Sequence, residues 1–152
     1  MRTILAVFYF CAVLFNWSCA RKLSSSSNIN QGISGYVKEV RGNQMPSPGV
    51  TQAAPKGIET TIYIYELTNL SQVQGTAPFY KIIGAKFIQS ITSDSLGHFA
   101  AELPPGSYSL FTKVDEQFYA NSFDEKNNIA AVTVKENKVS EVNITISAKA
   151  SY

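Results

Sequence analysis

The chain has 152 residues, a length typical of one domain, and a formal net charge of +2 at pH 7. This near-neutral charge, with no cluster of lysine and arginine standing out from the rest, argues against an electrostatic nucleic-acid interface. Hydrophobic residues make up 45% of the sequence, which is sufficient for a packed core.

The N-terminus has the pattern of an export signal. Arg2 precedes an uncharged apolar run over residues 4–15, which is shorter than the roughly 20 residues of a membrane-spanning helix. Cys19 follows a small serine and resembles the lipidated cysteine of a bacterial lipoprotein signal. The alternative is ordinary cleavage after Ala20, where Ser18 and Ala20 meet the small-x-small requirement. We predict a signal peptide over residues 1–19, cleaved before Cys19, with acyl chains such as palmitate on that cysteine.

A polar tether follows over residues 20–31, including four consecutive serines at 24–27. Such a segment spaces a globular domain, here residues 32–152, from a membrane surface. Ala20 does not resemble the aspartate that retains many lipoproteins in the inner membrane, and no acidic run of the kind associated with surface display follows. We therefore expect an outer-membrane anchor facing the periplasm. Cys11 lies inside the signal, so the mature domain has no pair of cysteines for a disulfide.

From residue 33 onward the pattern is that of β-strands. Alternating or β-branched segments separated by turn formers every 8–12 residues predict a β-sandwich or barrel, and no apolar stripe has helical spacing. We expect irregular loops over residues 68–78 and 121–128. The predicted strands cover residues 33–37, 60–67, 79–83, 85–92, 98–103, 107–114, 118–120, 130–134 and 139–146.

Two neighbouring motifs carry a family resemblance. Asp94-Ser-Leu-Gly97 forms a turn before one strand, and Leu103-Pro-Pro-Gly106 followed by Ser-Tyr108-Ser-Leu leads into the next. This arrangement is similar to carboxypeptidase regulatory-like domains, and Ile33-Ser-Gly-Tyr-Val looks like the first strand of that family. The resemblance spans roughly residues 33–146. It implies an all-β, transthyretin-like (prealbumin-like) Greek-key sandwich of about seven strands, and it says almost nothing about function.

No catalytic or metal-binding residue is expected. Zinc catalysis needs about three protein ligands, and the chain has one histidine, His98, which we expect to face solvent while Phe99 points inward. Asp94 has the position of a turn residue, and too few oxygen ligands accompany it for calcium. A Lys–Asn isopeptide cross-link requires buried partners, whereas Lys38 and Asn143 alternate toward solvent. We therefore predict no enzyme activity, no cofactor and no metal.

Two sets of residues are candidates for ligand contact. Tyr63 and Tyr65 share one strand face about 7 Å apart, where their rings could stack on a sugar or a peptide. The alternative is that the rings pack across strands or under the 121–128 loop. Loop residues Asn43, Met45, Tyr119 and Asn121 could form a recognition rim, since loops on a rigid sandwich often carry function.

We therefore expect a non-enzymatic lipoprotein of the bacterial cell envelope. Its sandwich would serve as a protein-interaction or structural module, and the alternative is a carbohydrate- or peptide-binding module that uses the aromatic sheet face. The expected partners are the membrane, through the lipid on Cys19, and an unidentified envelope protein or glycan. In the resembling family this domain commonly accompanies larger enzymes or transporters, so a partner here would be a separate chain.

Overall fold

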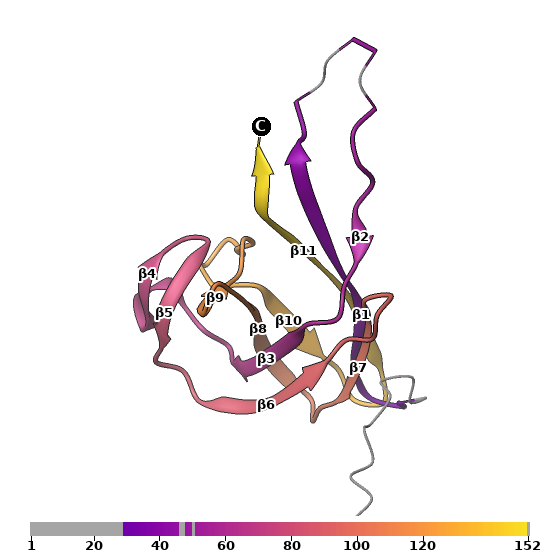
Figure 1. Cartoon of the computed structure of the whole chain (residues 1–152). Coiled ribbons are helices and arrows are strands. Elements are labelled where there is room, and N and C mark those ends of the chain that lie inside the picture. The colour runs from indigo at the N-terminus through magenta and orange to yellow at the C-terminus, as the bar shows by residue number, and fades with distance from the viewer. Residues whose placement is uncertain (1–28, 46–47, 50, 152) are drawn as a thin grey trace, which may run out of the picture.

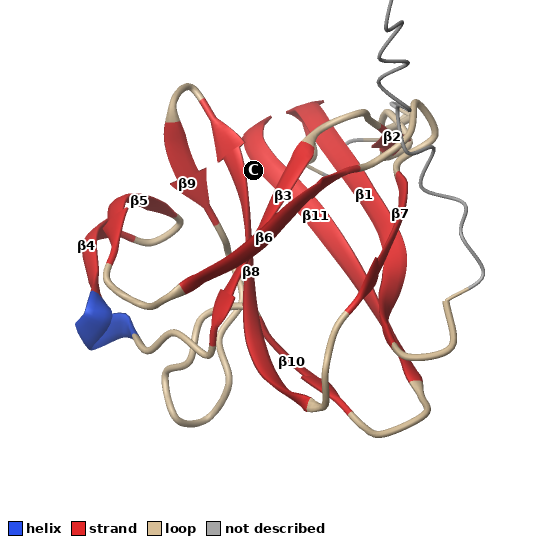
Figure 2. Ribbon diagram, turned by 90° about the horizontal axis from the view of Figure 1, so that it is seen from below, coloured by secondary structure: helices blue, strands red, loops and turns tan. Residues whose placement is uncertain are grey.

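The computed structural model describes residues 29–45, 48–49 and 51–151. The predicted signal, Cys19 and most of the predicted tether lie outside the described residues. Two β-sheets, one of four strands and one of seven, account for the described chain (Figures 1 and 2). Its only helix is a single 3-10 turn, η1 (Leu70–Gln72), and none of the described helical structure could cross a bilayer. The prediction of an all-β sandwich is confirmed, but the described chain has eleven strands where the resemblance implied about seven.

The smaller sheet is organised around its first strand, which pairs with the other three. It consists of β1 (Gly32–Asn43), β2 (Lys56–Gly57), β7 (His98–Glu102) and β11 (Val139–Ser151). β11 runs parallel to β1, while β2 and β7 are antiparallel to it. Gly35 permits the close approach of β1 and β11, because a Cβ atom there would collide with the carbonyl oxygen of Val142.

The larger sheet has the order β4-β5-β9-β8-β3-β6, and β10 also pairs with β8. Its strands are β3 (Thr61–Glu66), β4 (Val73–Thr76), β5 (Phe79–Ile83), β6 (Phe87–Thr92), β8 (Gly106–Val114), β9 (Gln117–Tyr119) and β10 (Ala131–Val134). β9 pairs with the C-terminal part of β8 and β10 with the N-terminal part, so the two short strands share one edge of β8.

The core between the sheets is mainly aliphatic, and we call it the inner core. Its fully buried side chains include Ile33 and Val37 from β1 and Ile62 and Ile64 from β3. Within each strand these residues are two or four positions apart, because successive side chains of a strand point to opposite faces. The alternation recognised in the sequence therefore positions the core.

A second cluster, which we call the outer cluster, lies on the other face of the larger sheet. It contains Tyr65, Tyr80, Phe111, Ala120 and Ile129. The β4–β5 hairpin supplies Tyr80, and the segment after β9 supplies Ala120 and Ile129, so these two segments cover the face (Figure 2). β8 consequently has both faces buried.

The two sequence motifs form turns as predicted. Asp94 accepts backbone hydrogen bonds from Leu96 and His98, both at 2.9 Å, and Gly97 has the positive φ (+87°) that the turn requires. In the second turn the hydroxyl of Tyr108 donates to the carbonyl oxygen of Pro104 at 2.9 Å. The first turn joins β6 of one sheet to β7 of the other, and so holds the two layers together.

The structure corrects the expected loop over residues 68–78, which contains η1 and β4. Asn69 caps η1 by accepting from the amide of Ser71, and the side chain of Gln72 accepts from the amide of Asn69. β4 exists because it pairs with β5, a tertiary contact that its polar sequence does not reveal. β1 and β11 also extend beyond their predicted ends, because each continues as long as the other pairs with it.

Candidate functional site

Tyr63 and Tyr65 share a face, and their rings take part in cross-strand packing. Tyr65 is 9% exposed and makes edge-to-face contacts with Phe87, Phe111 and Phe118 at centroid distances of 5.4, 5.7 and 5.9 Å. Burial, and then the nearby Tyr63, raise the pKa of the Tyr65 hydroxyl. The ring of Tyr65 is therefore committed to the outer cluster and has no open face for a sugar.

Tyr63 is only partly buried, but its ring already has a cation beside it. It meets Phe118 edge-to-face at 5.4 Å, and the ammonium of Lys113 lies 5.6 Å from the Tyr63 centroid and 5.3 Å from that of Phe118. A cation over two rings is a favourable arrangement in itself. The pair predicted to stack on a ligand thus contributes mainly to packing within the protein.

The four residues predicted to lie in loops fall into two separate places, and two of them end strands: Asn43 is the last residue of β1, and Tyr119 is the last residue of β9 and only 2% exposed. Asn43 and Met45 lie at the far end of β1, where Asn43 pairs with Ser151 and its side chain accepts from the amide of Met45 at 2.8 Å. Met45 is 53% exposed. Tyr119 and Asn121 lie next to the middle of β11, around Thr145. Thr145 is opposite Lys38, five residues before Asn43 on β1, which corresponds to roughly 16 Å along a strand.

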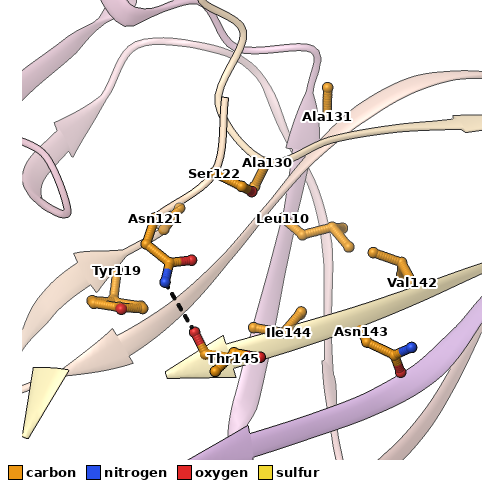
Figure 3. Close-up of a pocket in the computed structure, with 11 residues that line it drawn as sticks. Leu110, Tyr119, Asn121, Ser122, Ala130, Ala131, Val142, Asn143, Ile144 and Thr145 are labelled. Atoms are coloured by element: carbon orange, nitrogen blue, oxygen red, sulfur yellow. Dashed lines mark hydrogen bonds between the residues drawn. The ribbon is translucent and has the colours of Figure 1, made fainter. Parts of the chain in front are cut away.

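Tyr119 and Asn121 help to line a hollow of ≈170 Å³ at the side of the sandwich (Figure 3). One wall is β11, and the other consists of β8, the end of β9 and the segment that leads into β10. Its lining combines apolar side chains with amides and hydroxyls. The lining residues are Leu110, Tyr119, Ala120, Asn121, Ser122, Ala130, Ala131, Val142, Asn143, Ile144 and Thr145.

Both side chains hydrogen-bond to the outer edge of β11. The Nδ2 of Asn121 donates to the carbonyl oxygen of Thr145 at 3.3 Å, a bond drawn in Figure 3. The amide of Ser147 donates to the Tyr119 hydroxyl oxygen at 3.1 Å, and the two side-chain hydroxyls are also 3.1 Å apart. Side chains here take positions that a neighbouring strand would otherwise occupy.

Over the rest of that edge no second strand pairs with β11 within the described chain, although the start of β11 contacts β10, where the Ser140 hydroxyl donates to the carbonyl oxygen of Thr133 at 2.6 Å. At the start of the ladder Gly32 donates to the carbonyl oxygen of Lys138. Because peptide groups alternate in direction along a strand, the even-numbered residues from 138 to 146 point toward β1 and the odd-numbered residues point away. The backbone groups of Glu141 and Asn143 therefore point outward beside the hollow.

The remaining predicted polar residues have structural surroundings. His98 is half-buried, with its ring edge-on to Tyr36 at 4.2 Å, so it is less open to solvent than predicted, whereas Phe99 is buried as expected. Lys38 and Asn143 are exposed, as predicted. Backbone hydrogen bonds, first from His98 and then from Leu96, lower the pKa of Asp94. Over residues 29–45, 48–49 and 51–151, no three potential metal ligands come together.

Tyr119, Asn121 and the strand over residues 139–146 were each predicted from the sequence, but the contact between them was not. Val142, Ile144 and Ile146 alternate with Glu141, Asn143 and Thr145, which marks a strand with one polar face. The pattern does not say that the strand lies at a sheet edge, since that depends on which strands pair.

No protein-family model, curated protein or solved structure matches the chain.

Proposed function

We propose that the chain is a non-enzymatic lipoprotein of the cell envelope whose β-sandwich serves as a protein-interaction module. The export pattern, Cys19 and the serine-rich tether support anchoring at a membrane that faces the periplasm. A transthyretin-like Greek-key topology is part of this proposal. Its support is the sequence resemblance, together with Tyr108, whose hydroxyl bonds back to the backbone four residues upstream as in the tyrosine corners of Greek-key sandwiches.

One observation carries the interaction role. β11 is thirteen residues long, pairs with another strand on one side only among the described residues, and borders a hollow lined by apolar and polar side chains. Exposed strand edges are the places where β-proteins recruit other chains, unless the edge is blocked. The aromatic face supports the alternative, a glycan-binding module, less well, because the ring of Tyr65 is buried and Lys113 already lies over Tyr63.

The anchor and the interaction can be tested in one experiment. Cells that produce the tagged protein are grown with an alkyne fatty acid, and a photo-cross-linking residue replaces Asn143 at the β11 edge. The matched control places the same residue at Lys81, an exposed position on β5. We expect fatty-acid labelling that disappears in Cys19→Ala, and one discrete envelope protein cross-linked from position 143 but not from position 81.

Two results would contradict the proposal. Labelling that persists in Cys19→Ala would show that the protein is not anchored through that cysteine. Equal cross-linking from both positions, or glycan binding that is lost in Tyr63→Ala, would move the function to the alternative.

A further inference from the structure

We infer that the outer edge of β11, from Glu141 to Thr145, takes one added strand from a partner protein. The partner segment would be extended and amphipathic, with small aliphatic side chains at alternate positions that enter the hollow. This inference rests on the proposed interaction role and specifies the class of partner.

The backbone supplies the first argument. Glu141 and Asn143 point their N–H and C=O groups away from β1, and no backbone bond to another described residue uses them. An extended segment beside this edge would continue the smaller sheet by the same hydrogen bonding that joins its other strands. A sequence-independent ladder of this kind supplies affinity, and side-chain pockets supply specificity.

The hollow supplies the second argument, because it lies directly beside the same stretch of strand. Its volume of ≈170 Å³ is close to the roughly 150 Å³ of an engineered protein cavity that binds benzene. It therefore accommodates one leucine-sized or two valine-sized groups. Val142 and Ile144 are only half-buried, although they pack against the inner core. An entering aliphatic side chain would complete their burial, while the polar positions of the added strand would lie near Asn121 and Asn143.

Side chains already occupy part of the edge. Asn121 and Tyr119 bond the carbonyl oxygen of Thr145 and the amide of Ser147, which are strand-pairing groups. Asn121 is exposed, and its bond is long at 3.3 Å, so a competing backbone donor can displace it. Tyr119, which is buried and accepts from the amide of Ser147, limits how far an incoming strand extends past Thr145.

A free segment fits this edge better than a second copy of the chain does. The hollow is a slot bounded on one side by β11 and on the other by Asn121, Ser122 and Ala130 (Figure 3). A second sandwich would bring its own Asn121–Ala130 segment against this one, because that segment flanks its β11 as well. A single extended segment can enter the hollow because it carries no equivalent of the Asn121–Ala130 segment that would collide with this one.

The test uses a synthetic peptide in which valine and threonine alternate, with three valines, four threonines and two lysines at each end for solubility. Its binding to the processed lipoprotein in detergent is measured by fluorescence anisotropy. One version of the peptide is N-methylated at its valines and another at its threonines, so each keeps its side chains but loses the donors of one edge. We expect the version whose methyl groups lie on the edge that faces β11 to lose at least tenfold in affinity. The other version should bind almost normally. Equal effects of both versions, or no binding at about 1 mM, would overturn the inference.

Variants of the protein provide the matched comparison. Asn143→Pro and Asn143→Ala both remove the amide side chain, but only proline removes the outward N–H. That N–H is outside the β1 ladder, so proline leaves the backbone pairing in place. Both variants lose the bond from the Tyr36 amide to the Asn143 side chain at 3.2 Å, so they remain matched in that respect. We expect Asn143→Ala to bind the peptide normally and Asn143→Pro to lose at least tenfold. Asn121→Ala frees the carbonyl oxygen of Thr145, so we expect affinity to rise by about three- to tenfold. Unchanged binding in both Asn143→Pro and Asn121→Ala would count against the edge.

The outcomes separate this inference from the proposed function. If a discrete envelope protein cross-links in cells but the peptide does not bind, the interaction role stands and strand addition is wrong. If the peptide binds but nothing cross-links from position 143, the edge is competent and the proposed cellular role fails. If sedimentation shows that the original chain is a dimer and that Asn143→Pro is a monomer, the edge pairs with a second copy of the chain. That result would overturn the inference that the added strand comes from another protein.

Discussion

The inner core and the outer cluster differ in composition and in how the chain encloses them. The inner core is built mainly from Ile, Val and Leu on strands that alternate regularly between two sheets, whereas the outer cluster is aromatic and is closed by a hairpin and a loop. β8 contributes to both, since Leu110 faces inward and Phe111 faces outward. The comparison shows that one strand pattern suffices for a sandwich core, while a second layer needs segments brought from elsewhere in the chain.

The largest effects are expected from truncating these two neighbouring residues. Leu110→Ala should lower the free energy of unfolding by about 3 kcal/mol and Phe111→Ala by about 4 kcal/mol, since each leaves a cavity around a buried side chain. Urea denaturation measures both values. If the two clusters belong to one cooperative unit, each variant shifts a single transition without changing its slope.

Hydrogen exchange gives the sharper version of the same test. Should Phe111→Ala leave the global transition unchanged and remove protection only in β4 and β5, the outer cluster would be a separable layer. Leu110→Ala is the control, because its effect must reach strands of both sheets.

A second pair of variants compares one buried hydroxyl from each cluster. Tyr108 belongs to the inner core and donates to Pro104, so Tyr108→Phe should cost about 1 kcal/mol in unfolding free energy. The Tyr80 hydroxyl in the outer cluster is buried and has no hydrogen-bond partner among the described residues, and burial raises its pKa. Tyr80→Phe should therefore leave stability unchanged or raise it by up to about 1 kcal/mol. A loss on Tyr80→Phe equal to that of Tyr108→Phe would show that the hydroxyl is satisfied in solution.

The smallest effects concern pH and the two aspartate turns, one beside each cluster. Hydrogen bonds to its carboxylate lower the pKa of Asp94, and bonds from the side chain and then the backbone of Asn128 lower that of Asp124. A folded-state pKa below the unfolded value of about 3.9 contributes stability above that pH, and the contribution is lost as the pH falls through the folded pKa. The urea concentration at the midpoint of unfolding should therefore decrease as the pH is lowered below about 4.

The variants Asp94→Asn and Asp124→Asn keep one acceptor oxygen in each turn and remove the titration, and Asp124→Asn also loses the bond that Asn128 Nδ2 donates to Asp124 Oδ2. Each should flatten the fall of the urea midpoint with pH, and the double variant should flatten it more. An acid dependence as steep in the double variant as in the original chain would assign the effect to other carboxylates.

Much of this fold follows from the sequence, because strand alternation and turn chemistry are local. The turns at Asp94 and Pro104 and the strand around Ile62 form where predicted. β4 and the far ends of β1 and β11 could not be predicted, since they exist only through pairing with distant residues.

The candidate site was harder to predict than the fold. Tyr119 and Asn121 were identified as loop residues, but their contact with Thr145 and Ser147 depends on β11 having no strand beyond it. The prediction that Tyr63 and Tyr65 share a face is correct, yet the burial of Tyr65 comes from Phe87, Phe111 and Phe118. Sequence alternation specifies which residues share a face and leaves open what covers that face.

The parallel pairing of β1 with β11 has a mechanical consequence. The described chain enters this ladder at Gly32 and leaves it at Ser151, and these two points lie at opposite ends of adjacent strands that run in the same direction (Figure 1). A pulling force applied between them slides the strands along each other, so the hydrogen bonds from Gly32 to Asn43 share the load instead of opening one at a time. The ladder therefore acts as a shear clamp, and the rest of the sandwich stays folded until that clamp yields.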